Sequence, residues 1–219
     1  MPLLLVDLDN TLLDRAAAFR RWAVAFRDKH APDDHAAVAW LIQADADGYE
    51  PRDRLALSVR ERFGLGPAAY ADLTNDLRWG MADFLELDPQ VSAALKRARS
   101  AGWLAVIVTN GTVEQQERKL RLTGLDREVD GWVISEAVGV KKPAPLIFRL
   151  AALNASAQLD EAWVIGDSAH ADIAGAHNLS LPSVWLHRGR SWQEPDFAPT
   201  LTVDNCHHAI EQAVAEGRP

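Results

Sequence analysis

Acidic, hydroxyl and amide side chains directly follow three apolar stretches of the chain. They are Asp7 with Asp9, Thr109 and Asn110 with Gly111, and Asp167 with Asp172. If these groups meet in one crevice, two carboxylates about 4 Å apart repel by about 4 kcal/mol at an effective dielectric of about 20. Several acids would therefore stay ionised together only beside a cation. Because the set offers oxygen ligands and neither His nor Cys, it favours a hard ion such as Mg²⁺ over Zn²⁺.

Two lysines can add positive charge to this acidic set. Lys141 and Lys142 precede Pro143 in a turn that follows a predicted strand. A Mg²⁺ ion held by a few protein oxygens keeps open positions for a phosphate, and a lysine and the N–H groups near Thr109–Gly111 would neutralise the remaining charge. The residues together predict a phosphoryl-transfer site. Lys142 is the first choice for its lysine, and Lys141 is the alternative.

Short apolar strands that alternate with helices are expected to position these residues. The predicted strands are Leu3–Leu8, Trp103–Thr109, Trp132–Ser135, Trp163–Gly166 and Pro182–Leu186, with an edge strand at Leu201–Val203. This alternation is typical of a parallel, doubly wound sheet, which binds ligands beyond the carboxyl ends of its strands. We therefore expect an α/β fold with a Rossmann-like core and the polar residues at one edge of its sheet. The tryptophans at the strands are expected in the core: Trp103, Trp132, Trp163 and Trp185.

A helical block interrupts this pattern after the first strand. Phe19, Trp22 and Phe26 follow helical spacing behind Asp14, a predicted N-cap. Three more helices are expected, over about 35–45, from Pro51 to Gly64 and from Pro67 to about 85. The sequence thus predicts two domains, an α/β core formed by residues 1–14 and 86–219 and an all-helical domain formed by residues 15–85.

The composition excludes several classes of protein. The 219 residues are 48% hydrophobic and 25% charged, as in ordinary globular proteins, and the net charge of −8 disfavours nucleic acid and acidic membranes as partners. The single cysteine, Cys206, excludes an internal disulfide framework. No apolar run approaches the roughly 20 residues of a membrane span. We expect a cytoplasmic protein with a small-molecule partner, and the oligomeric state stays open.

Four stretches of the sequence resemble the signature motifs of one known family. DLDNTLLD, TNG, KKP and GDSAHAD occur in this order and are similar to the four motifs of the haloacid dehalogenase-like hydrolase superfamily. The resemblance covers essentially the whole chain, since the helical block is similar to the cap domain inserted after the first strand in one large branch. It implies a hydrolase with a Mg²⁺ cofactor, whose cap selects the substrate.

The first motif carries the chemical roles that the resemblance implies. Asp7 would attack phosphorus and form an aspartyl-phosphate. Asp9 would protonate the leaving oxygen and then activate the hydrolytic water. Family members that cleave carbon–halogen bonds lack an aspartate at the second position, because a halide leaves without a proton. Asp9 therefore favours a phosphatase over a dehalogenase.

The later motifs would bind the phosphoryl group and the metal ion. The resemblance implies that Thr109 and the N–H groups of Asn110 and Gly111 bind the phosphoryl group, and that Lys142 neutralises its charge. It implies that Asp7, Asp167 and the backbone carbonyl of Asp9 bind Mg²⁺. Asp172 would orient Lys142 or the metal's water shell. The chain departs from the family pattern at Ala144, where many relatives have Asp after Lys-Pro.

These observations predict a Mg²⁺-dependent phosphomonoester hydrolase that acts on a small phosphorylated metabolite. A phosphosugar mutase on the same scaffold is one alternative, since it differs only in returning the phosphoryl group to a sugar. A phospho-aspartate signalling domain is a second alternative, although such domains lack a large insertion after the first strand. Arg15, Arg20 and Arg52 in the helical block could bind a second anionic group, but each is interpreted as an ordinary helix residue.

Overall fold

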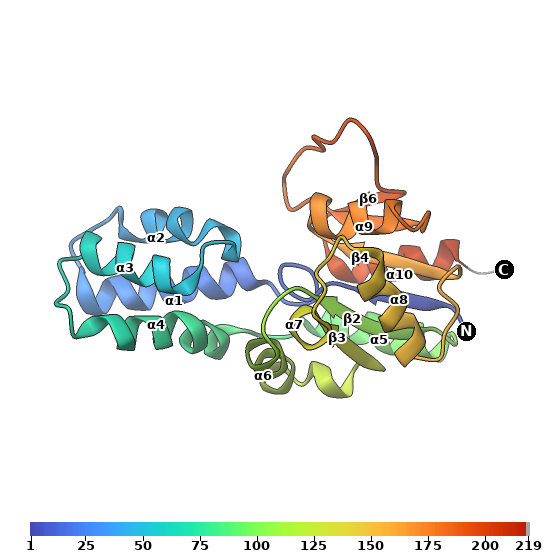
Figure 1. The fold of residues 1–219 in the computed structure, drawn as a ribbon, viewed down its shortest axis with the longest axis horizontal. Helices are drawn as coiled ribbons and strands as arrows, with labels where there is room; N and C mark the ends of the chain where they lie inside the picture. The colour runs from blue at the N-terminus through green and yellow to red at the C-terminus, as the bar shows by residue number, and fades with distance from the viewer. Residues whose placement is uncertain (218–219) are drawn as a thin grey trace. The chain divides into compact units, whose positions relative to one another are not determined.

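The computed structural model describes residues 1–217, which form two compact units (Figure 1). The first unit contains Met1–Leu13 and the chain from Leu87 onward, and the second contains Asp14–Glu86. No helix among residues 1–217 is long and apolar enough to cross a membrane.

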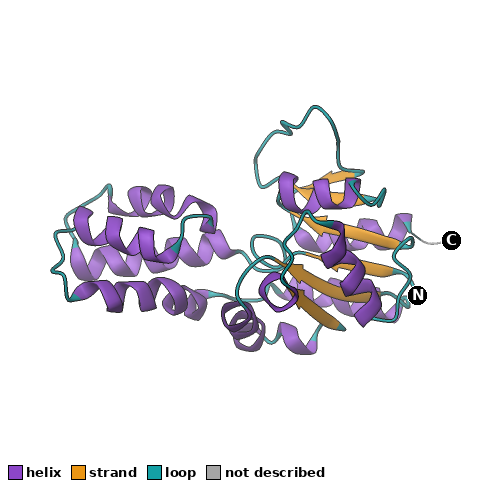
Figure 2. Cartoon of the chain, viewed as in Figure 1, coloured by secondary structure: helices purple, strands orange, loops and turns teal. Residues whose placement is uncertain are grey.

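A six-stranded, entirely parallel sheet forms the centre of the first unit. Its strands are β1 (Leu3–Val6), β2 (Leu104–Thr109), β3 (Gly131–Ile134), β4 (Ala162–Gly166), β5 (Ser183–Leu186) and β6 (Leu201–Val203), in the spatial order β3-β2-β1-β4-β5-β6. Figure 2 shows the strands as one layer with helices on both sides. The predicted α/β, doubly wound fold is therefore confirmed, and so is the edge strand at Leu201–Val203.

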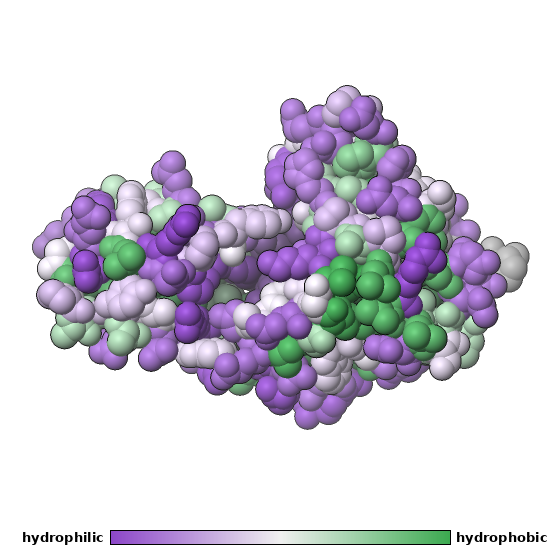
Figure 3. Space-filling view, in the orientation of Figure 1, coloured by the Kyte–Doolittle hydropathy of each residue, from purple (hydrophilic) through white to green (hydrophobic). Residues whose placement is uncertain are grey.

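Helices α5, α6, α8 and α10 flank this sheet, together with shorter turns. Their bounds are α5 (Pro89–Ser100), α6 (Val113–Thr123), η3 (Leu125–Arg127), α7 (Ser135–Val138), α8 (Pro145–Asn154), η4 (Ala169–Ile173), α9 (Ala174–His177) and α10 (Cys206–Glu216). Leu3 and Leu5 of β1 pack with Ile147 and Phe148 of α8 in the core, whereas α5 and α10 pack against each other. Figure 3 shows apolar side chains gathered on one face of this unit. Two leucines of α8, Leu146 and Leu153, are exposed.

The central strand β1 pairs in register with β2 and with β4. Val6 is paired with Ile107 of β2 and with Ile165 of β4. The parallel register therefore brings the residues that follow these three strands to the same edge of the sheet. All four residues of β1 are buried, as expected for a strand covered on both faces.

The second unit consists of helices alone. They are α1 (Arg15–His30), α2 (Ala37–Asp45), η1 (Ala46–Gly48), α3 (Arg52–Arg62), α4 (Ala69–Trp79) and η2 (Gly80–Phe84). Asp14 caps α1, since its carboxylate accepts a hydrogen bond from the Ala17 N–H at 2.9 Å, as predicted. Phe19, Trp22 and Phe26 are buried along one face of α1.

A buried ion-pair cluster lies among these helices. Asp45 at the end of α2 accepts two hydrogen bonds of 2.8 Å from Arg15 and one of 2.7 Å from Arg52. Asp45 and Arg15 are buried, and a pocket of about 350 Å³ lies beside them. The two arginines thus pair with an acid of their own unit, which agrees with their interpretation as structural helix residues.

The expectation that all four strand tryptophans lie in the core is wrong for one of them. Trp103, Trp163 and Trp185 are buried, but Trp132 is 36% exposed. Trp132 belongs to β3, which is an edge strand and therefore has a neighbouring strand on one side only. The position of a strand within the sheet is not encoded in its own apolar pattern.

Candidate active site

Asp7 directly follows β1, and two contacts orient its carboxylate. Its backbone N–H donates to the Ile165 carbonyl of β4 at 2.9 Å, which extends the sheet by one more hydrogen bond. Oδ1 accepts a hydrogen bond from Lys142 Nζ at 2.6 Å, and Oδ2 accepts one from Thr11 Oγ1 at 3.2 Å. Asp7 is buried, so this carboxylate has little solvent around it.

Lys142 lies between two carboxylates. Its Nζ is 2.6 Å from Asp7 Oδ1 and 2.7 Å from Asp172 Oδ1, and the side chain is buried. The neighbouring Lys141 is exposed. Of the two candidate lysines, Lys142 is therefore the one that contacts the acids.

Asp172 reaches this lysine because of the turn that follows β4. Ser168 is the N-cap of η4, and its N–H donates to Asp172 Oδ2 at 3.0 Å. The carboxylate lies over the end of β4, where a Cβ at Gly166 would approach Asp172 Cγ to 2.2 Å. Only glycine leaves room for this side chain at position 166.

Asp7 and Asp172 share one lysine, and the pKa values of the cluster reflect this imbalance. Burial raises the pKa of Asp7 to about 8, and the negative charges of Asp172 and Asp167 add to this effect against the attraction of Lys142. Burial opposes the charge of Lys142, but its attraction to Asp172 and Asp7 is stronger and raises the pKa of Lys142. A further cation would relieve the repulsion among the carboxylates.

Three of the acids fit a metal ion. Asp7, Asp167 and Asp172 each offer one carboxylate oxygen, and these oxygens lie within 4.8 Å of one another. All three residues are buried and supply oxygen only, which is the ligand type that Mg²⁺ prefers. The donor set therefore fits the expected hard cation.

Two arginines contact Asp167 from the segment after β5. Arg190 donates to Asp167 Oδ2 at 3.0 Å and to the Asp167 carbonyl at 2.6 Å, and Arg188 lies 3.5 Å from Oδ2. Neither arginine was among the residues predicted for the site. They belong to a segment without periodicity, so no sequence signal connects them with Asp167.

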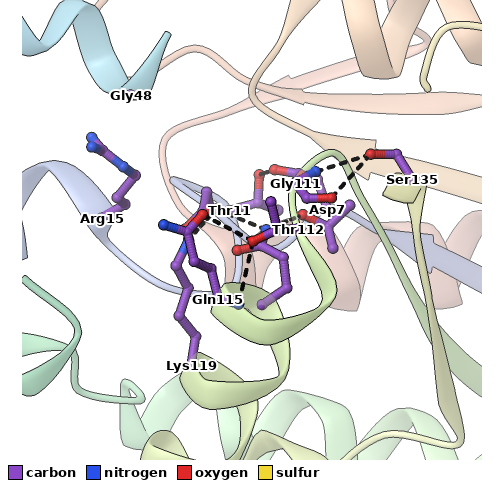
Figure 4. Close-up of polar contacts among 12 residues, drawn as sticks. Asp7, Thr11, Arg15, Gly48, Gly111, Thr112, Gln115, Lys119 and Ser135 are labelled. Atoms are coloured by element: carbon purple, nitrogen blue, oxygen red, sulfur yellow. Dashed lines mark hydrogen bonds and ion pairs between the residues drawn. The ribbon is translucent and has the colours of Figure 1, made fainter. Parts of the chain in front are cut away.

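Asn110 and Gly111 use their polar groups within the protein. The Asn110 side chain donates to the Lys142 carbonyl at 3.1 Å and accepts from the Lys142 N–H at 2.9 Å. The Gly111 N–H was expected to bind phosphate, but it donates to Ser135 Oγ at 3.0 Å (Figure 4). In this conformation Ser135 would have to give way before that N–H could bind a ligand.

The carboxylate of Asp9 is held by helix α6. Lys119 Nζ lies 2.8 Å from Oδ1 and 2.6 Å from Oδ2, and Gln116 Nε2 donates to Oδ2 at 3.0 Å. Gln116 Nε2 also donates to Thr109 Oγ1 at 2.6 Å. Figure 4 shows the Lys119 side chain extending from α6 into this group of polar residues.

Neither residue of α6 was predicted to belong to the site, although a sequence signal was present. Gln116 and Lys119 are three residues apart, so they share one face of the helix that follows the TNG stretch. Thr112 caps α6, but the Gln115 side chain does not complete a capping box. Thr112 accepts from the Gln115 N–H, but its hydroxyl donates to Gln115 Oε1, and Gln115 does not return a bond to the Thr112 backbone.

Known proteins resemble this chain in sequence along nearly its whole length. The family described as haloacid dehalogenase-like hydrolase matches residues 1–179. A phosphoserine phosphatase of Thermus thermophilus is 34% identical over 93% of this chain and 95% of its own length. A pyrimidine 5'-nucleotidase of Escherichia coli is 39% identical over 50% of this chain and 49% of its own length.

The fold also resembles solved structures. A crystal structure of a magnesium-bound hydrolase from Bacillus subtilis superposes with a TM-score of 0.75 at 24% identity, over 97% of this chain and 98% of that one. At this identity the likeness concerns the fold alone.

Proposed function

Because this chain belongs to the haloacid dehalogenase-like hydrolases, we propose that it is a Mg²⁺-dependent phosphatase that hydrolyses a small phosphorylated metabolite. One observation carries the proposal: the buried Asp7 carboxylate lies 2.6 Å from Lys142 Nζ and beside the Asp167 carboxylate. A second carboxylate, Asp9, follows Asp7 by two residues in the sequence. This arrangement offers a nucleophile, a compensating cation, a metal ligand and an acid–base group within one site.

In the first step, a carboxylate oxygen of Asp7 attacks phosphorus. The bond between phosphorus and the ester oxygen breaks, and the leaving oxygen takes a proton from Asp9. Lys142 offsets negative charge on the nucleophile and on the phosphoryl oxygens, while Asp172 holds the lysine in place. The 2.7 Å contact between Lys142 Nζ and Asp172 Oδ1 supports this division of roles.

In the second step, Asp9 acts as a base. It takes a proton from a water molecule whose oxygen attacks the phosphorus of the aspartyl-phosphate, and the bond from phosphorus to Asp7 breaks. Inorganic phosphate leaves and the Asp7 carboxylate is regenerated. Thr109 and the backbone N–H of Asn110 would hold the phosphoryl oxygens through both steps, and the Gly111 N–H would join them once Ser135 moves.

Asp7, Asp167 and the carbonyl of Asp9 would hold the Mg²⁺ ion, which would offset the charge of the acids and of the phosphate. The raised pKa of Asp7 supports the need for this charge, because Asp7 and Asp172 share one lysine. We propose that the helical unit acts as the cap of this site and selects the substrate. The pocket beside Arg15 lies in that unit.

The relatives support a phosphate ester as substrate. The phosphoserine phosphatase that matches nearly the whole chain makes O-phosphoserine the first compound to test, and the nucleotidase adds pyrimidine nucleotides. A carbon–halogen bond is a poor candidate, since Asp9 supplies a proton that a leaving halide does not need.

Phosphate release from a panel of metabolites tests the proposal, with Mg²⁺ and with a chelator. The wild type should release phosphate only with the metal, and Asp7→Asn should abolish release from every ester. Lys142→Met should reduce turnover by at least about 100-fold, as loss of a transition-state charge contact does, whereas Lys141→Met is the matched control. Near-normal turnover of Asp7→Asn would contradict the mechanism.

The same assay separates the alternatives. A mutase would need a bisphosphate activator and would return a sugar phosphate instead of phosphate. A signalling domain would keep a long-lived aspartyl-phosphate and would not turn over small esters.

A further inference from the structure

The Asp9 carboxylate is held from outside the four motifs. Lys119 and Gln116 place an ammonium and an amide on it, with three nitrogen–oxygen distances between 2.6 and 3.0 Å. Both side chains are buried, with exposed fractions of 8% and 2%. A buried lysine without an acidic partner would be costly, so this ion pair is part of how the site is built.

Gln116 connects Asp9 with the phosphoryl-binding residue. An amide nitrogen carries two hydrogens, and Gln116 Nε2 directs them to Asp9 Oδ2 and to Thr109 Oγ1. Because the Thr109 hydroxyl accepts this bond, its own hydrogen can be donated to a phosphoryl oxygen. One side chain thereby orients an acid–base group and a phosphate-binding group relative to each other.

Gly111 makes this approach of Gln116 possible. A Cβ at position 111 would lie 3.0 Å from both Cδ and Cγ of Gln116, which is closer than ordinary contact. The glycine of the TNG stretch therefore leaves space for Gln116 in addition to forming the turn. Substitution by alanine would move the amide that holds Asp9.

The side chain of Asp9 needs such support. It is 23% exposed, whereas the side chain of Asp7 is 10% exposed and is held by Lys142. If the carboxylate can rotate, a smaller fraction of the molecules has Asp9 oriented toward the leaving oxygen, and the rate falls. Misplacement of a catalytic group by about 1 Å costs on the order of 100-fold in rate.

We infer that Lys119 and Gln116 are positioning residues that hold Asp9 through its Oδ2, so that Oδ1 can carry the proton and give it to the leaving oxygen. This inference rests on the proposed phosphatase function. It extends the reaction machinery to α6, a helix that the motifs do not include. Neither residue touches the substrate in this assignment, since both act through Asp9 and Thr109.

The dependence of the rate on the leaving group tests the inference. An alkyl phosphate releases an alkoxide that needs a proton, whereas p-nitrophenyl phosphate releases a stable anion that does not. Because kcat/KM reports only steps up to cleavage of the ester bond, it isolates the step in which Asp9 donates a proton. Lys119→Met should lower kcat/KM for the alkyl ester by about 100-fold, the usual contribution of a general acid, and for p-nitrophenyl phosphate by less than about 3-fold.

Matched variants separate positioning from folding. Lys119→Arg keeps the ion pair and should restore most of the activity on the alkyl ester. Gln116→Met keeps the size of the side chain and should lower kcat/KM for both esters through Thr109 but markedly more for the alkyl ester, so it decides the question if Lys119→Met does not fold. Arg121→Met, at an exposed position of the same helix, is the control and should match the wild type for both esters.

Each outcome has one meaning. A selective loss with the alkyl ester, parallel to that of Asp9→Asn, supports the inference. Equal losses with the two esters in both folded variants overturn it and leave the proposed function intact. A wild-type protein that hydrolyses neither ester overturns the proposed function, and the inference with it.

Discussion

Two buried groups of charged residues, one in each unit, are balanced in opposite ways. In the helical unit, one acid lies between two arginines, since Asp45 pairs with Arg15 and Arg52. In the α/β unit, one lysine lies between two acids, since Lys142 pairs with Asp7 and Asp172, while the third acid, Asp167, has two arginines of its own.

The pKa values of the two groups diverge accordingly. Burial acts to raise the pKa of Asp45, but the hydrogen bonds and charges of its arginines outweigh burial and lower that pKa. Burial and neighbouring acids raise the pKa of Asp7 to about 8. An acid with two cationic partners is a stable structural link, whereas two buried acids that share one lysine mark a place where further positive charge can enter. The difference separates a group that stabilises the fold from a group that can do chemistry.

The largest expected effect concerns activity and comes from Asp7→Asn. Removal of the nucleophile should lower kcat by at least about 10⁴-fold, as is usual for a covalent catalyst. The free energy of unfolding should stay the same or rise, because one of the crowded acids becomes neutral. Steady-state phosphate release and urea unfolding of the same sample measure both. A clear loss of stability would contradict the view that this group is held under electrostatic repulsion.

The opposite result is expected for Asp45→Asn. Breaking a buried ion pair leaves the arginines without their charge partner, so the free energy of unfolding should fall by about 3 kcal/mol. Urea unfolding followed by tryptophan fluorescence measures this change. Asp33→Asn, at an exposed position of the same unit, is the control and should change stability by less than about 0.5 kcal/mol. If Asp45→Asn is as stable as the control, the arginine pairs contribute nothing to the fold.

Magnesium should stabilise only through the acid-rich group. At a Mg²⁺ concentration of about ten times Kd, binding to the folded state adds about 1.4 kcal/mol to the free energy of unfolding. A thermal shift that saturates with Mg²⁺ and is reversed by a chelator checks this in the wild type. The shift should vanish in Asp167→Asn and persist in Asp45→Asn. A shift in Asp167→Asn of the same size would place the ion elsewhere.

The smallest effect should appear at acid pH. Because the pKa of Asp45 is lower in the folded protein than in the unfolded chain, its ion pairs contribute stability above about pH 4 and lose it as the pH falls through the lowered value. The difference in unfolding free energy between wild type and Asp45→Asn should therefore shrink from about pH 5 to about pH 3. A difference that stays constant over this range would contradict the lowered pKa.

The parallel sheet and the meeting of its strand ends could be predicted from local patterns. Apolar runs followed by Asp7, Thr109 and Asp167 identify the strands and the edge at which they end. The register between β1, β2 and β4 then brings these residues to the same level, because parallel strands end at the same edge. Trp132 shows the limit of such patterns, since its exposure depends on the order of the strands.

The residues that surround the motif side chains were less accessible to prediction. Lys119 and Gln116 contact Asp9 because α6 turns one particular face to the end of β1, and the rotation of a helix about its axis is set by packing. Arg190 reaches Asp167 from a segment with no regular pattern. Side-chain contacts between elements distant in sequence depend on the assembled fold, so single motifs do not reveal them.

The bracing of Lys142 by Asn110 affects how variants of the TNG stretch should be interpreted. The Asn110 amide binds both the carbonyl and the N–H of Lys142, so it ties the backbone of one loop to that of another. A shorter or apolar residue at position 110 would release the lysine backbone and shift the ammonium that faces Asp7. Slower turnover in such a variant would thus report a displaced Lys142 ammonium as well as weaker binding of phosphate. The loop after β2 and the loop that contains Lys142 are therefore expected to move together.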